Sequence, residues 1–149
     1  MKKVLIKKTL TYVLVLIGIG NSLTAFAYPT FSQIIDAAGN NANAVYLGQV
    51  TCDPSSQYLY AEIQDQSAPV PGIWLSLHIY KGSQMNTVTD AISGDQSPSQ
   101  IIRVEGGPGD YYISVTKTGA GVRSYTVTYQ CVTSVITFSN TSINPLQQQ

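Results

Sequence analysis

The segment Gly106–Cys131 constrains the fold more than any other part of this chain. It reads GGPGDYYISVTKTGAGVRSYTVTYQC, in which glycine and proline turns precede and separate two runs of alternating residues. An alternation of period two is typical of half-buried β-strands, and it predicts strands at Tyr111–Lys117 and Ser124–Cys131. Two such strands joined by a short glycine-containing turn pair in an antiparallel manner. The segment therefore indicates an all-β protein.

The remaining residues repeat this pattern of short strands and turns. Further strands are predicted at Val45–Cys52, Gln57–Ile63, Ile73–Tyr80, Asn86–Ile92, Gln100–Glu105 and Val132–Phe138. Proline is excluded from central strands, so Pro69 and Pro71 place a loop after Ile63. About seven to eight short strands, with turn signals every ~8–12 residues, predict a single antiparallel β-sandwich domain over residues 45–138.

The first 27 residues have the layout of a secretory signal peptide. Four lysines come first, a short apolar run spans Leu10–Gly20, and Ala25-Phe26-Ala27 supplies the small residues that precede a cut after Ala27. A transmembrane anchor is the alternative, but about a dozen apolar residues fall short of the ~20 that span a bilayer. The chain is therefore expected to be secreted or periplasmic, with no membrane span after cleavage.

The two segments that flank the sandwich carry weaker signals. Residues 28–44 form a lead-in in which Phe31, Ile34 and Ile35 recur at helical spacing, so one short helix or an ordered arm is expected there. Residues 139–149 are polar and end in three glutamines, and we expect a disordered tail.

The two cysteines, Cys52 and Cys131, allow a single intrachain disulfide. Disulfides are typical of exported proteins, and a bridge over about 80 residues contributes about 4.5 kcal/mol in the chain-entropy model. Free or metal-binding thiols are the alternative, but a metal site needs more ligands and the chain has one histidine. A disulfide between strands near the two ends of the domain suits a sandwich.

The charge balance excludes two classes of partner. Four of the eight basic residues lie in the predicted signal, so residues 28–149 keep four basic and eight acidic side chains, a formal net charge of −4. Nucleic acids and anionic membrane surfaces are recognised through basic patches. We expect neither as a partner.

Four stretches of the sequence together resemble a known family. They are Leu47-Gly48-Gln49-Val50, then WLSLHIYKG at Trp74–Gly82, GPGDYYISV at Gly107–Val115, and SYTVT at Ser124–Thr128. From about Gly48 to Cys131 their order resembles the bacterial pre-peptidase C-terminal domain. The resemblance implies a jelly-roll-like sandwich that accompanies secreted peptidases. Gln57 and Ile73 stand near the places where that family usually has acids, so the resemblance does not imply the calcium binding of some members.

No arrangement of residues in the sequence indicates an enzyme. His78 is the only histidine, and no Gly-x-Ser-x-Gly elbow accompanies it as a serine-type triad would require. Glu62 and Glu105 could serve as the acid and base of a glycoside hydrolase, whose carboxyl groups lie about 5–9 Å apart. Nothing in the sequence brings these two glutamates together. A non-catalytic protein is expected, with a small hydrolase as the least favoured reading.

Four aspartates are the candidate ligands for a calcium ion, which is the one cofactor the sequence leaves open. Asp90 and Asp95 flank a glycine-containing loop, and Asp53 and Asp65 lie on other loops. Calcium takes six to eight oxygen ligands, which loops of extracellular sandwiches often supply. Turn formation by aspartate is the alternative reading.

Aromatic residues give the best indication of function. Trp74, His78 and Tyr80 should share the face of the strand Ile73–Tyr80 that is opposite its leucines, and Tyr58 and Tyr60 would join them if their neighbours point inward. An exposed row of such rings can stack on sugars or on a partner protein. These five residues predict a binding or accessory module for a glycan or protein partner. A structural or assembly subunit at the cell surface is the alternative, and it predicts a sheet edge open to strand addition.

Overall fold

A computed structural model describes residues 28–134, 138 and 141–149 of this protein. The predicted signal peptide and its cleavage site lie outside this range. The described residues form nine strands, which are β1 Thr30–Ile35, β2 Val45–Cys52, β3 Ser56–Asp65, β4 Leu75–Lys81, β5 Gln84–Asp90, β6 Ile102–Val104, β7 Gly109–Lys117, β8 Arg123–Thr133 and β9 Ser142–Gln147. Over the same residues, no helix is long and apolar enough to cross a membrane.

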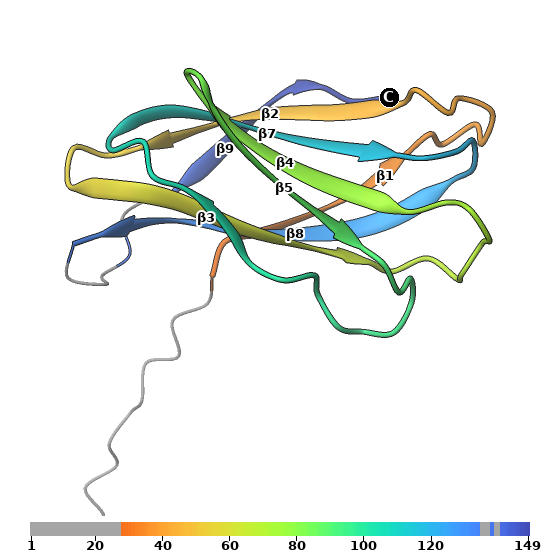
Figure 1. Ribbon diagram of the computed structural model, residues 1–149. Helices are drawn as coiled ribbons and strands as arrows, with labels where there is room; N and C mark the ends of the chain where they lie inside the picture. Colours follow the sequence, from red (N-terminus) through yellow and green to blue (C-terminus); the bar gives the residue numbers. More distant parts are fainter. Residues whose placement is uncertain (1–27, 135–137, 139–140) are drawn as a thin grey trace, which may run out of the picture.

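The strands form two antiparallel sheets that pack face to face as a sandwich (Figure 1). One sheet has the order β1-β8-β3-β6, and the other has the order β5-β4-β7-β2-β9. The first eight strands pair as β1 with β8, β2 with β7, β3 with β6, and β4 with β5. This is the pairing of one long hairpin that has been rolled over on itself, which is a jelly roll. β9 is an additional strand at the outer edge of β2.

The core lies between the two sheets and is built from alternate residues of each strand. Leu75, Leu77 and Ile79 of β4 are fully buried, as are Tyr111, Ile113 and Val115 of β7 and Leu59, Ala61 and Ile63 of β3. Tyrosines as well as aliphatic side chains fill this space because β-branched and aromatic residues suit a pleated, half-buried surface. The alternation predicted for these strands is confirmed.

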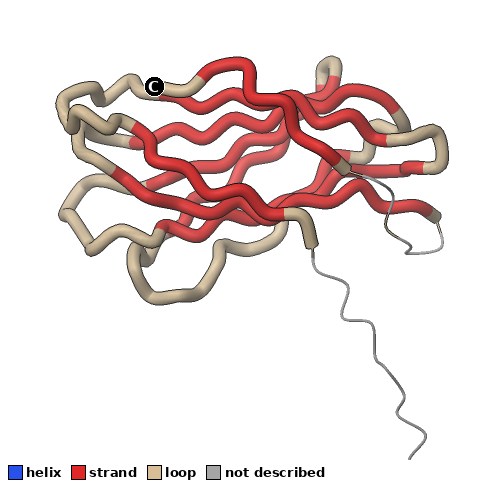
Figure 2. The backbone as a smooth tube through the Cα atoms, turned by 180° about the vertical axis from the view of Figure 1, so that it is seen from behind, coloured by secondary structure: helices blue, strands red, loops and turns tan. Residues whose placement is uncertain are grey.

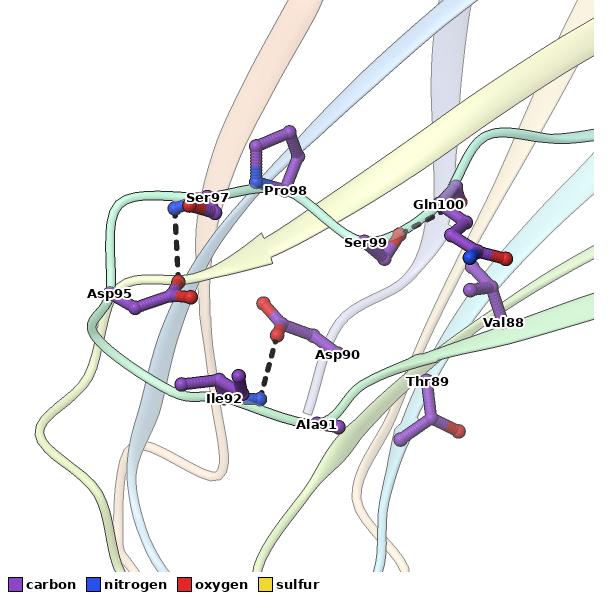
Figure 3. A pocket seen from close by; sticks show the side chains of 10 residues that line it. All are labelled: Val88, Thr89, Asp90, Ala91, Ile92, Asp95, Ser97, Pro98, Ser99 and Gln100. Atoms are coloured by element: carbon purple, nitrogen blue, oxygen red, sulfur yellow. Dashed lines mark hydrogen bonds between the residues drawn. The ribbon is translucent and has the colours of Figure 1, made fainter.

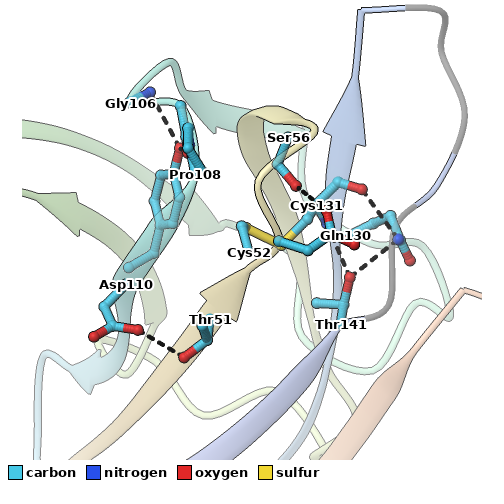
Figure 4. The surroundings of a disulfide bond; sticks show 12 residues. Thr51, Cys52, Ser56, Gly106, Pro108, Asp110, Gln130, Cys131 and Thr141 are labelled. Atoms are coloured by element: carbon cyan, nitrogen blue, oxygen red, sulfur yellow. Dashed lines mark hydrogen bonds between the residues drawn. A yellow bond between two sulfur atoms is a disulfide. The ribbon is translucent and has the colours of Figure 1, made fainter.

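The predicted disulfide joins the two sheets at one end of the sandwich. Cys52 ends β2 and Cys131 lies on β8, with a Cα–Cα distance of 5.6 Å (Figure 4). Both cysteines belong to the buried core. The bridge therefore ties together residues 79 apart in the chain, one from each layer.

Of the two forms expected for the lead-in, a short helix or an ordered arm, the helix is wrong, because Thr30–Ile35 forms strand β1 (Figure 2). Phe31 and Ile35 lie on the inner side, while Ile34 is exposed. An isolated helix of so few residues is marginal, whereas pairing with β8 satisfies the backbone and buries Phe31 against the core.

The tail expected to be disordered also forms a strand, β9, which pairs with β2. Of its two large apolar residues, Ile143 packs against the core and Leu146 is exposed. The separate strand expected to begin at Val132 is wrong at its start, because Val132 belongs to β8. β8 continues through Thr133, residues 135–137 lie outside the described range, and Val132 pairs with Phe138 in an isolated bridge.

Candidate functional site

Strand β4 presents a row of polar and aromatic side chains on the outer side of the five-stranded sheet. Leu75, Leu77 and Ile79 point into the core, so Ser76, His78 and Tyr80 point outward. The row continues at Trp74, since the Thr118 backbone N–H donates to the Trp74 carbonyl at 3.2 Å and extends the pairing of β4 with β7. Trp74 is 46% exposed. The predicted common face for Trp74, His78 and Tyr80 is therefore confirmed.

Neighbouring strands widen this row into a surface, which we call the β4 face. Each outward residue of β4 lies in register with one residue of β5 and one of β7. The rows are Thr89–Ser76–Thr116, Thr87–His78–Ser114 and Met85–Tyr80–Tyr112. The β4 face consists of these residues and Trp74. At ~3.3 Å per residue, the row from Trp74 to Tyr80 is about 20 Å long.

His78 lies at the centre of the β4 face between two hydroxyl groups. Its Nδ1 is 2.9 Å from Oγ1 of Thr87, and its Nε2 is 2.9 Å from Oγ1 of Thr116. Burial lowers the pKa of His78 below its ordinary value, so the imidazole is neutral at neutral pH. A neutral ring donates one of these hydrogen bonds and accepts the other.

The aromatic rings lie at both ends of the β4 face. Tyr80 stacks on His78 with ring centroids 6.1 Å apart and an interplanar angle of 26°, and its hydroxyl accepts a hydrogen bond from Ser114. Tyr112, directly across from Tyr80, is 40% exposed. Tyr112 is not among the five candidates predicted from the sequence, because the register of β4 with β7 is not visible there.

No residue of the β4 face carries a charge while His78 is neutral. The face offers hydroxyl groups, ring faces and one imidazole instead. Hydroxyls both donate and accept, and they can exchange hydrogen bonds with a polyhydroxylated ligand. A charged ligand would find no counter-ion on this surface.

A groove of about 330 Å³ adjoins the β4 face at Trp74. The loop before β4 contributes Val70 and Pro71, and the loop after β5 contributes Ala91 and Ile92. Ile92 is 62% exposed. Ile92 also lines a second pocket, of about 410 Å³, between β5 and the following loop (Figure 3).

A buried ion pair holds the loops that form this groove. Arg123 of β8 donates through Nε to Oδ2 of Asp65 at 3.0 Å, and its Nη2 also contacts that oxygen. The same guanidinium donates to the Ala68 carbonyl at 2.9 Å, while Ser93 donates to the Asp65 carboxylate at 3.0 Å. The pair therefore fastens both groove-forming loops to the ends of β3 and β8.

Tyr58 and Tyr60 do not join the β4 face. They lie on β3, in the four-stranded sheet, and their outward side is the opposite surface of the sandwich. There Tyr60 meets Tyr28 edge to face at 6.0 Å between centroids, and Arg103 lies over the Tyr58 ring at 5.4 Å. The predicted set of five aromatic candidates is split between two faces because both sheets expose alternate residues.

The residues proposed for catalysis are not brought together. Glu62 faces outward on β3, and Glu105 forms an ion pair with Arg103 at 3.0 Å. The register of β3 with β6 separates their rows by four residues, or about 13 Å, which exceeds the spacing that glycoside hydrolases use. His78 is on the other sheet.

The four aspartates proposed as calcium ligands do not converge either. Asp53 precedes β3 and Asp65 ends it, so the length of the sandwich separates them. Asp90 accepts hydrogen bonds from the backbone of Asp65 and of Ile92, while Asp95 accepts one from Ser97 (Figure 3). Throughout residues 28–134, 138 and 141–149, no group of three or more acidic, histidine or cysteine side chains is placed to hold a metal.

No protein-family model matches the chain, and no curated protein matches it in sequence.

Proposed function

We propose that this protein is an exported, non-catalytic binding module that recognises a neutral glycan through the β4 face. One observation carries the proposal, namely an uncharged surface of hydroxyl groups with exposed aromatic rings at both ends. Ring faces provide apolar contact area at low entropic cost, and hydroxyl groups provide adaptable hydrogen bonds. Trp74 and Tyr80 would stack on sugar rings, and His78 with its threonines would bond to sugar hydroxyls.

Because the β4 face carries no charge, it favours neutral ligands over charged ones. The chain as a whole carries an excess of acids after residue 27, which disfavours anionic polysaccharides. A neutral polysaccharide meets neither repulsion nor an unpaired charge. The groove beside Trp74 would then hold one end of the bound polysaccharide.

The proposal also includes export of the protein and its resemblance to pre-peptidase C-terminal domains. The amino-terminal layout of a signal peptide and the Cys52–Cys131 disulfide both favour an oxidising compartment. The jelly-roll strand order supports the resemblance to pre-peptidase C-terminal domains at the level of the fold. An accessory role beside a secreted enzyme follows from that resemblance.

A binding panel of neutral and charged polysaccharides tests the proposal. We expect binding to at least one neutral polysaccharide, with Trp74→Ala and Tyr80→Ala each weakening it about fivefold, since one stacked ring contributes roughly 1 kcal/mol. Tyr60→Ala is the matched control, because it removes a half-buried tyrosine from the opposite face. Binding that is lost in the control but kept in Trp74→Ala would transfer the site to the other sheet and refute the proposal.

A further inference from the structure

Strand β9 lies outside the eight-strand roll and adds to it at one edge. The pairings of β1 with β8 through β4 with β5 are complete without it. β9 pairs with β2 alone, and it leaves its other side open at the margin of the five-stranded sheet (Figure 1). It therefore resembles a strand added to a finished domain.

One side chain anchors β9. Ile143 is half-buried and packs against the core, whereas the other five residues of the strand are exposed. The pairing also contains an irregularity at Leu47 and Gly48, and Pro145 lies opposite Gly48. Proline has no N–H to donate, so this part of the ladder is weakened.

The anchor fits a notch that the rest of the domain provides. A Cβ atom at Gly48 would lie 2.7 Å from Cδ1 of Ile143 and 2.8 Å from the Tyr46 hydroxyl, so only glycine leaves room for Ile143. The backbone of Ile143 also lies close to the Tyr129 hydroxyl of β8. β2 and β8 thus form a socket complementary to β9.

The start of the strand is held in the same way. The Thr141 hydroxyl accepts hydrogen bonds from the Cys131 N–H at 3.2 Å and from Nε2 of Gln130 at 3.0 Å (Figure 4). The unit that docks on the domain therefore runs from Thr141 through β9. Every contact that it makes is with residues that any second copy of the chain also carries.

We propose that β9 exchanges between two copies of this chain, so that the strand of one copy occupies the β2 edge and the Gly48 notch of the other. The contacts of the exchanged strand are the same within one chain and between chains, so protein concentration and the connecting segment set the balance. The exchange buries no new surface on the β4 face. The inference therefore stands independently of the glycan-binding proposal.

Cysteine trapping between two differently tagged copies of the full chain tests the exchange. One copy carries Gln49→Cys and the other Asn144→Cys, because these residues lie opposite each other on β2 and β9. The copies are mixed at high concentration, incubated, and oxidised mildly while the buried native disulfide stays closed. We expect a mixed disulfide in several-fold excess over a control pair of Gln49→Cys with Ser83→Cys, a residue of the distant β4–β5 turn.

The anchor residue gives a second readout. Adding Ile143→Asp to the Asn144→Cys copy should reduce the mixed disulfide to the control level, whereas Ile143→Val should keep most of it. Equal yields from the test and control pairs overturn the proposal. A yield that Ile143→Asp does not change also overturns it, because the strand would then not be docking in the notch.

Discussion

The Asp65–Arg123 ion pair should be highly sensitive to the loss of either charge. Its two side chains are 0% and 1% exposed, and the carboxylate also accepts hydrogen bonds from Ser93 and from the Ser67 N–H. Asp65→Asn keeps the shape of the side chain and removes its charge. The guanidinium of Arg123 then remains buried without a counter-ion.

The expected loss follows from the cost of that buried charge. Removing one partner of a buried ion pair costs about 3–5 kcal/mol, whereas replacing both by apolar groups of similar volume is often close to neutral. A domain of this size has a total stability of roughly 5–15 kcal/mol, so Asp65→Asn should remove a large part of it. The double variant Asp65→Leu with Arg123→Met should be much less destabilised than the sum of the single variants.

A double-mutant cycle by urea unfolding at neutral pH measures this coupling. The control cycle uses Arg103 and Glu105, whose side chains are 61% and 65% exposed and whose ion pair should contribute at most ~1 kcal/mol. We expect the coupling of the buried pair to exceed that of the exposed pair several-fold. If Asp65→Asn costs no more than the exposed control, the role assigned to this ion pair is wrong.

Three further perturbations have defined outcomes. Replacing Cys52 and Cys131 by alanine should lower the free energy of unfolding by about 4.5 kcal/mol, because the disulfide closes a loop of 79 residues. A loss below ~1 kcal/mol in urea titrations would contradict the chain-entropy model. Lys117 holds the pKa of Asp36 well below its ordinary value. The Asp36 contribution to stability is therefore complete above the ordinary carboxyl pKa of about 4 and is lost as the pH falls below it. In unfolding experiments from mildly acidic to strongly acidic pH, Asp36→Asn should flatten this dependence of stability on pH. Gly48→Val should expel the β9 isoleucine, cost about 1–3 kcal/mol and speed amide exchange throughout β9, and unchanged exchange would disprove the notch.

The strands of the roll were predictable because their signals are local. The segment Val45–Cys52 matches β2 to the residue, and the alternation within Ile73–Tyr80 identified which side chains enter the core. The disulfide was predictable for a different reason, since two cysteines in one chain have a single intrachain pairing available. Each of these inferences needs only period-two patterning or counting.

The two terminal strands were not predictable in this way. β1 and β9 are edge strands whose backbone partners, β8 and β2, lie far away in the sequence. The spacing of Phe31 and Ile35 satisfies a helix and a strand equally well. Only the completed sheets decide between the two, because they supply hydrogen-bond partners that a short isolated segment lacks.

The candidate site was predictable along one strand and not across strands. Alternation alone places Trp74, His78 and Tyr80 together. The threonines that bond to His78 come from β5 and β7, and their positions depend on register. For the same reason Tyr58 and Tyr60 were grouped with the wrong face, since an outward position does not specify which sheet it belongs to.

Backbone amide shifts measured by NMR during titration with a neutral polysaccharide would locate the binding surface. We expect the largest shift changes on Trp74, Ser76, His78 and Tyr80, with smaller changes on the facing residues of β5 and β7. Amides of β3 and β8 on the opposite face should stay unperturbed. Shift changes centred on Tyr58 and Tyr60, or spread evenly over both sheets, would contradict the proposed binding surface.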